Sequence, residues 1–187
     1  MSQNSYGQSL ITSQVSGSAV TNTTVATSML PGAAKFTMPA NIWYVGQKWQ
    51  LNASGLISTL TASPGTLTLT LLQDAIAVWS SSTIPLNTTA QSNATWRLTL
   101  DLTVRSIGQG TGTTLVGSGA FSSRAILGVA AVGAGPSGLV NCPEGSPSVG
   151  SGFDCTFSHV TDLFAQWSVA NAANQITCEQ YELILQN

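Results

Sequence analysis

The chain has 187 residues, of which 43 % are hydrophobic and only 6 % are charged, and its formal net charge is −2. This length suits a single domain whose core forms without metals or obligatory disulfides. An average soluble domain is about 25 % charged, so the solubility of this chain depends on serine, threonine, asparagine and glutamine. Five lysine and arginine residues are too few for the basic surface that binds phosphates, and we expect no nucleic-acid partner.

The first 32 residues differ from the rest. Residues 1–30 are polar and uncharged, and Leu30-Pro31-Gly32 predicts a turn where they end. The N-terminus has neither the basic start nor the apolar core of a signal peptide, and no segment reaches the about 20 apolar residues of a membrane span. We therefore expect synthesis in a cytoplasm and no membrane partner. Residues 1–32 are expected to be an extended arm, either disordered or lying on a neighbouring subunit, and 33–187 a β domain.

From residue 33 onward, short strands alternate with turns. Alternating apolar and polar residues predict half-buried strands at 49–54 and 66–71, separated by a turn at Ser63-Pro64-Gly65. Further strands are expected at 75–79, 114–121, 163–169 and 175–185. The glycine-rich segment 108–112 predicts a hairpin turn rather than a phosphate-binding loop, because it lacks the lysine of such loops.

The clearest strand is 96–105, where apolar side chains from Trp96 to Val104 share one face. Arg97, Asp101 and Arg105 share the other. In the last strand the apolar phase shifts between Cys178 and Tyr181, which predicts a β-bulge at 179–180. No amphipathic helix is evident. Eight to ten short strands with regular turns predict an all-β fold, a single antiparallel β-sandwich or barrel.

Residues 128–152 are rich in glycine and proline and predict a long loop of the kind that is functional or reaches a partner. Alternation of Phe153, Cys155 and Phe157 predicts another short strand at 153–158. The odd number of cysteines argues against a disulfide framework. Cys142 and Cys155 would pair only if the loop between them folded back, and we expect reduced thiols.

The sequence offers no catalytic apparatus. His159 is the single histidine, and a serine triad with Asp154 or Asp162 would need a nucleophile that no sequence motif marks. A turn histidine with a neighbouring hydrogen-bond partner is the simpler interpretation. The seven acidic residues form no marked pair for glycoside hydrolysis, and the cysteines lack the spacing of a zinc site. We expect no enzyme activity, no catalytic residue, no cofactor and no metal.

Partner contacts are expected from two regions. Trp49, Trp96 and Trp167 lie on the apolar phase of their strands and should be core residues. Trp43 and Tyr44 fall in a loop, where exposed aromatic rings would contact a protein or a glycan. The apolar residues of the arm would contact a neighbour. The expected contact residues are Tyr6, Leu10, Ile11, Val15, Trp43 and Tyr44.

The chain also carries a scattered pattern of familiar segments. They are QNSYGQSL at 3–10, KFTMPANIW at 35–43, VGQK at 45–48, ASGLIST at 53–59, PGTL at 64–67, NATWRL at 93–98, LTVRS at 102–106 and EQYEL at 179–183. This pattern resembles a group of small structural proteins that tailed bacteriophages and prophages encode among their virion genes. The region around Cys142 and Cys155 does not match it.

The resemblance implies a jelly-roll-like sandwich, a homotrimer, displayed on the surface of the virion and made in the cytoplasm of the host bacterium. It implies a capsid decoration or cement protein that binds the major capsid protein and stabilises the head against the packaged DNA. The alternative is a tail or fibre-type module that recognises host glycans, with Trp43 as its first contact. The family offers no catalytic residues to carry over.

Overall fold

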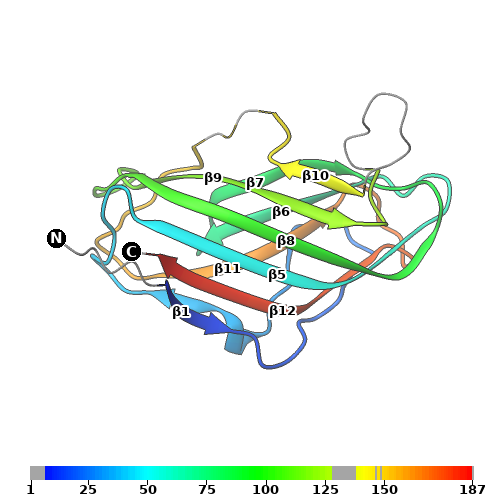
Figure 1. Ribbon diagram of the computed structural model, residues 1–187, viewed down its shortest axis with the longest axis horizontal. Coiled ribbons are helices and arrows are strands. Elements are labelled where there is room, and N and C mark those ends of the chain that lie inside the picture. Colours follow the sequence, from blue (N-terminus) through cyan, green and yellow to red (C-terminus); the bar gives the residue numbers. More distant parts are fainter. Residues whose placement is uncertain (1–6, 128–137, 146, 148, 187) are drawn as a thin grey trace.

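The computed structural model describes residues 7–127, 138–145, 147 and 149–186. They form two antiparallel β-sheets that pack face to face, with the larger sheet in front in Figure 1. The predicted all-β sandwich is therefore confirmed, whereas its jelly-roll topology stays a prediction. The described residues contain no helix long and apolar enough to cross a membrane.

The large sheet has the strand order β1-β12-β5-β8-β9-β10, and β2 also pairs with β12. Its strands are β1 (Gly7–Thr12), β2 (Val20–Thr21), β5 (Lys48–Thr59), β8 (Gln91–Ser106), β9 (Thr114–Ser123), β10 (Leu139–Cys142) and β12 (Gln175–Gln186). The long strands β5, β8 and β12 each bury one face and leave the other on the surface. In β8 this gives the long regular alternation from Trp96 to Val104.

The small sheet has the order β3-β11-β6-β7, and β4 also pairs with β11. Its strands are β3 (Thr27–Ser28), β4 (Phe36–Met38), β6 (Thr66–Gln73), β7 (Ile76–Pro85) and β11 (His159–Trp167). A short 3-10 helix, η1 (Gly32–Ala34), precedes β4. The described residues thus hold twelve strands rather than eight to ten. Three of the additional strands, β1, β2 and β3, lie in the polar N-terminal region, where no alternation marks them. A further one, β10, pairs with β9 inside the segment 128–152, so the expectation of a loop throughout that segment is wrong for Leu139–Cys142.

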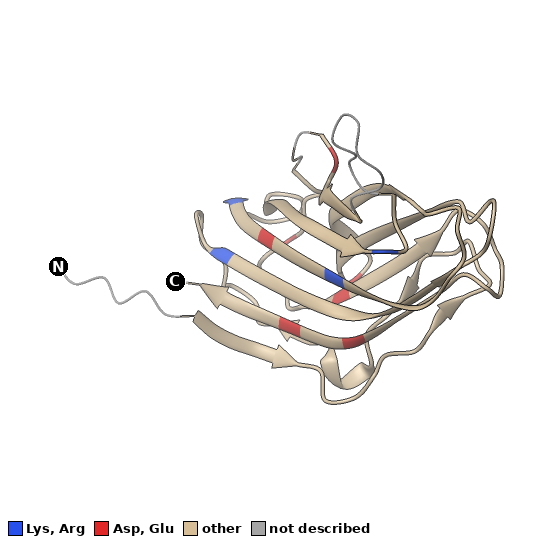
Figure 2. Cartoon of the chain, turned by 45° about the vertical axis from the view of Figure 1, so that its right-hand side comes forward, with Lys and Arg blue, Asp and Glu red and all other residues tan. Residues whose placement is uncertain are grey.

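The core lies between the sheets and is made by the inward phase of each strand. Trp49, Trp96 and Trp167 are each at most 2 % exposed, as their positions in the strands predict. Burying one large apolar side chain stabilises the fold by roughly 1.5–3 kcal/mol. The outward phase is polar, and Figure 2 shows single charged residues scattered along the strands of the large sheet.

The N-terminal segment is part of the sandwich from Gly7 onward. β1 and β2 both pair with β12, and β3 pairs with β11, so the segment forms the edge of both sheets on one side. Val20 and Met29 are at most 1 % exposed. The expectation of a disordered arm, or of one lying on a neighbour, is therefore wrong for residues 7–32, and residues 1–6 lie outside the described residues.

Two local expectations have opposite outcomes. The bulge in the last strand is confirmed, because the register between β12 and β5 shifts between Cys178 and Gln180. Gly55 faces this bulge, and a Cβ there would lie 1.9 Å from the carbonyl oxygen of Thr177.

The strand expected at 153–158 is wrong. Phe153 forms one isolated bridge with Thr113, and a turn follows that leaves Phe157 64 % exposed.

Candidate functional site

Three loops meet at the end of the sandwich where β1 begins and β12 ends. They are 39–47 before β5, 107–113 between β8 and β9, and 150–158 before β11. The backbone N–H of Asn41 donates to the carbonyl oxygen of Cys155 at 2.8 Å, and the N–H of Cys155 donates to that of Gly108 at 3.3 Å. The loops are therefore held to one another by main-chain hydrogen bonds, and we call this region the loop end.

Asp154 organises the loop end through its carboxylate. One oxygen accepts hydrogen bonds from the N–H and the hydroxyl of Thr156, at 2.9 and 2.6 Å, and the other accepts from the N–H of Gly110 at 2.7 Å. These hydrogen bonds, that of the Thr156 hydroxyl foremost, lower the pKa of Asp154 below its ordinary value. The charged carboxylate thus fixes the 107–113 loop against the segment before β11.

His159 is buried beneath these loops and has a partner at each ring nitrogen. Nδ1 lies 2.7 Å from Oδ2 of Asp74, and Nε2 lies 2.6 Å from the carbonyl oxygen of Asp154. Both partners are acceptors, so neither nitrogen is available to take a proton from a serine. Asp162, the other acid considered as a triad partner, forms an ion pair with Lys35 at 2.6 Å. His159 therefore has a structural role.

Trp43 is buried, at 5 % exposure, and the expectation of an exposed contact at this position is wrong. Its ring lies 5.1 Å from that of Trp49 and 5.1 Å from that of Phe153, measured between centroids. The loop prediction was correct, but the loop folds inward and Trp43 closes the end of the core. Tyr44, its neighbour in the chain, points outward and is 46 % exposed.

Four large apolar side chains are exposed at the loop end. Tyr44 and Val45 belong to the loop before β5, Ile107 to the next loop and Phe157 to the turn before β11, and their exposed fractions run from 46 to 64 %. We call these four residues the loop-end patch. The sequence marked Tyr44 alone. Val45, Ile107 and Phe157 were not singled out as contacts, because exposure in a loop leaves no periodic signal.

The other expected contact residues do not gather there. Leu10 and Ile11 are half-buried on β1 and pack against the core of their own chain. Val15 is 58 % exposed in the segment after β1. Tyr6 lies outside the described residues.

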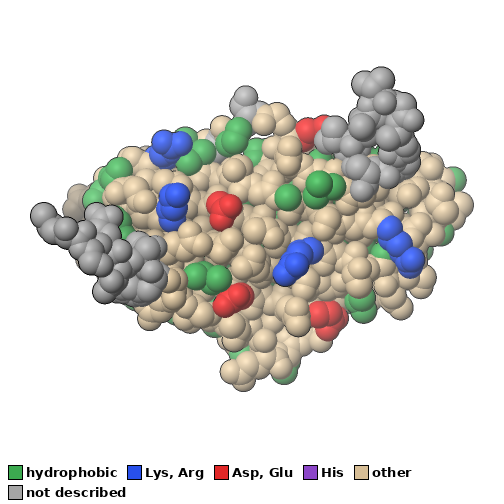
Figure 3. Space-filling view, viewed as in Figure 1, with side chains coloured by type: hydrophobic (Ala, Val, Ile, Leu, Met, Phe, Trp, Pro, Cys, Tyr) green, Lys and Arg blue, Asp and Glu red, His purple; other side chains and the backbone are tan. Residues whose placement is uncertain are grey.

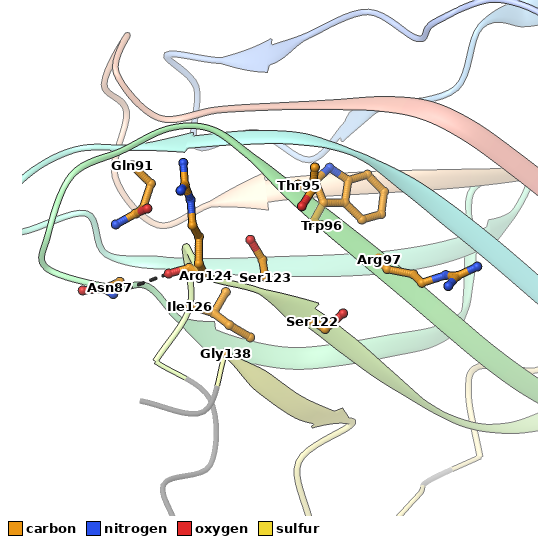
Figure 4. Close-up of a pocket in the computed structure, with 10 residues that line it drawn as sticks. All are labelled: Asn87, Gln91, Thr95, Trp96, Arg97, Ser122, Ser123, Arg124, Ile126 and Gly138. Atoms are coloured by element: carbon orange, nitrogen blue, oxygen red, sulfur yellow. Dashed lines mark hydrogen bonds between the residues drawn. The ribbon is translucent and has the colours of Figure 1, made fainter. Parts of the chain in front are cut away.

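A groove lies on the outer face of the large sheet near the opposite end of β8 (Figure 4), on a face where Figure 3 shows mostly polar side chains and few charged ones. Its volume is about 710 Å³, and its lining includes Arg97, Arg124, Asn87, Gln91, Thr95 and Ser122. Arg97 also lines an adjoining hollow of about 390 Å³ that reaches Gln180 and Glu182 on β12. The sequence had placed Arg97 on the outer face, but nothing in it marked a groove.

The described residues offer little for metal binding or for thiol reactivity. Among the described residues, no group of three or more histidine, cysteine, aspartate and glutamate side chains is placed to hold a metal ion. Cys142, Cys155 and Cys178 are buried and unpaired. Burial raises the pKa of both Cys142 and Cys178 to about 12, which keeps these two thiols protonated and unreactive.

Comparison with known proteins gives no relative. No protein-family model, no curated protein and no solved structure matches the chain. The candidate sites are therefore the loop-end patch and the groove lined by Arg97 and Arg124. Their ligands are inferred from the side chains that form them.

Proposed function

We propose that this protein is a structural protein of a virion, a capsid decoration protein of a tailed bacteriophage that binds the major capsid protein. In this proposal it is a homotrimer on the capsid surface, and it stabilises the head by adhesion rather than by catalysis. The observation that carries the proposal is the loop-end patch, four exposed apolar side chains on loops that are hydrogen-bonded to one another.

The patch suits a protein partner. Tyrosine and phenylalanine are enriched in the cores of protein interfaces, where they bury a large area at a small cost in side-chain entropy. The loops that carry Tyr44 and Phe157 are fixed by Asp154 and by the main-chain hydrogen bond from Asn41 to Cys155. A surface held in place before binding loses less entropy when it binds.

The low charge of the chain supports the same proposal. Only 6 % of its residues are charged, and a surface of serine, threonine and asparagine loses its water at a lower cost than a charged one. A symmetric trimer would present three copies of the patch, and linked sites that rebind locally turn a weak contact into firm attachment. The sequence resemblance to virion structural proteins supplies the identity of the expected partner.

Co-sedimentation tests the proposal. Purified protein is mixed with heads of the encoding virus that were assembled without it, and the pellet is analysed for both proteins. We expect saturable binding at a fixed ratio to the major capsid protein. The double variant Tyr44→Ser/Phe157→Ser should fold normally and lose at least tenfold in affinity, about 1.4 kcal/mol or more.

Val25→Ser is the matched control. Val25 is 69 % exposed, and it lies next to β3, which pairs with the part of β11 far from the loop end. This variant should bind heads as the parent does. Absence of binding to heads by the parent protein, or equal loss of binding in the control, would contradict the proposal.

The glycan-binding alternative depended on Trp43 as an exposed ring that stacks on a sugar. Trp43 is instead packed between Trp49 and Phe153. A stacking site at this position therefore has no support, and a tail or fibre role would need another surface.

A further inference from the structure

We infer that the groove between Arg97 and Arg124 is a binding site for an acidic saccharide, an extended ligand that carries both hydroxyl and carboxylate groups. The groove lies on the outer face of the large sheet and has a volume of about 710 Å³. It is formed at the opposite end of β8 from the loop-end patch. The inference goes beyond the adhesive function proposed above and does not depend on it.

The charge of the groove is positive. Arg97 and Arg124 are both exposed, and neither forms an ion pair with another described residue. Among the described residues, the lining contains no carboxylate. On the same strand as Arg97, the nearest acid is Asp101, four residues away or about 13 Å along the strand. Two guanidinium groups without acidic partners favour an anion, because arginine binds carboxylates through two parallel hydrogen bonds.

The positions of the two arginines indicate an extended ligand. Arg97 on β8 stands opposite Ser122 on β9, and Arg124 follows two residues after Ser122, just beyond the end of β9. Figure 4 shows their side chains extending in different directions from the sheet. A small anion would reach one guanidinium at a time, whereas a chain with repeated charges can reach both. The adjoining hollow beyond Arg97 is lined by Glu182 as well as Gln180. The carboxylate of Glu182 would repel an acidic ligand, so the ligand is placed between the two arginines and not in this hollow.

The remaining lining matches sugar hydroxyls. The hydroxyls of Thr95 and Ser122 can both donate and accept hydrogen bonds. The amide groups of Asn87 and Gln91 already form hydrogen bonds within the chain, and the side-chain oxygen of Gln91 can accept one more. Trp96 is the one aromatic residue among the described residues that line the groove. It is 2 % exposed, and its indole N–H already donates to the carbonyl oxygen of Thr177 at 3.1 Å.

Without an exposed ring, the groove lacks the stacking platform on which single-stranded nucleic acid depends. It is equally unsuited to a neutral sugar that binds by stacking. Recognition therefore depends on charge and hydrogen bonds.

The experiment is isothermal titration calorimetry of the full-length protein with the tetrasaccharide of α-1,4-linked galacturonic acid. Maltotetraose, a neutral chain of the same length, and inorganic phosphate are titrated in parallel. The variants Arg97→Gln and Arg124→Gln each remove one charge. Arg105→Gln is the matched control, since Arg105 is an exposed arginine on the same outer face of β8 but does not line the groove.

We expect the acidic tetrasaccharide to bind and to be weakened by added salt, while maltotetraose and phosphate bind at least tenfold less tightly. Each groove variant should weaken binding by about tenfold, the usual scale for a lost charge-assisted hydrogen bond at a binding site. Arg105→Gln should leave binding unchanged, and all three variants should keep the parent unfolding temperature.

Three results would overturn the inference. They are equal binding of maltotetraose, equal binding of inorganic phosphate, which would indicate a simple anion site, and retention of full affinity in both groove variants. Because capsid binding is measured separately with the loop-end variants, failure here leaves the adhesive proposal intact. Likewise, absence of binding to virus heads would leave the saccharide inference untouched, because the two sites are tested with different variants.

Discussion

Nδ1 of His159 lies 2.7 Å from Oδ2 of Asp74, and this contact joins the start of β11 to the turn between β6 and β7. The imidazole ring also packs edge-on against Phe153, with 5.1 Å between centroids. Asp74 has a φ of 53°, a left-handed conformation that asparagine also tolerates. Asp74 can therefore be replaced by asparagine without strain in the backbone.

His159→Ala should destabilise the fold by about 2 kcal/mol, because it removes two hydrogen bonds and a ring contact from a buried position. Asp74→Asn should cost less than 1 kcal/mol, since Asp74 is half-exposed and water screens the pair. Urea denaturation of both single variants and the double variant measures the coupling between them. Strict additivity would show that the contact contributes nothing to stability.

Trp43 and Tyr44 are neighbours in the chain with opposite roles. Trp43→Ala should destabilise the protein by about 3–5 kcal/mol, because it leaves a cavity between Trp49 and Phe153. Tyr44→Ala should change the free energy of unfolding by less than about 0.5 kcal/mol, as expected of a surface position. Thermal unfolding of the two variants side by side checks both values. A large loss of stability in Tyr44→Ala would mean that Tyr44 belongs to the fold and not to a binding surface.

The thiols of Cys142 and Cys178 should be protected in the native state. Burial raises the pKa of Cys142 and Cys178 to about 12, so almost no thiolate is present at neutral pH. With a chromogenic disulfide reagent at pH 7, we expect Cys142 and Cys178 to react only on unfolding. In denaturant without reductant all three cysteines should react, because none is in a disulfide. Rapid labelling of either residue in the folded protein, located by mass spectrometry, would contradict this assignment.

The strands could be predicted because their signal is local. The sequence alternates strictly from Thr66 to Leu71, and the structure buries the three leucines of this stretch. The same rule located the bulge, since one extra residue at Glu179 moves the apolar phase of β12 from Cys178 to Tyr181. Where one face of a strand packs on the core and the other contacts water, apolar and polar residues alternate in the sequence.

The sites could not be predicted because their signals are not local. Burial of Trp43 depends on Phe153, which a distant segment brings beneath the loop. The N-terminal segment reads as polar, yet Val20 and Met29 are buried because β12 and β11 offer free edges that the segment covers. The groove depends on Arg124, which lies beyond the regular part of β9, so no alternation indicated its direction.

The last prediction concerns pH. The hydrogen bond from the Thr156 hydroxyl, followed by those from the N–H groups of Gly110 and Thr156, lowers the pKa of Asp154 from its ordinary value of 3.8. The charged carboxylate is thus favoured more in the folded chain than in the unfolded chain. Its contribution to stability is complete above pH 3.8 and is lost as the pH falls through the lowered pKa of the folded protein.

Asp154→Asn should therefore unfold at a lower urea concentration than the parent at pH 7, and the gap should narrow as the pH is lowered below 3.8. Thr156→Val removes the strongest of the three hydrogen bonds and should reproduce part of the gap. Asp101→Asn, an exposed carboxylate on the outer face of β8, should match the parent at pH 7. If the difference in urea midpoint between Asp154→Asn and the parent stays constant at every pH, the residue acts through its shape and not its charge. The main-chain hydrogen bonds alone would then fix the loop end.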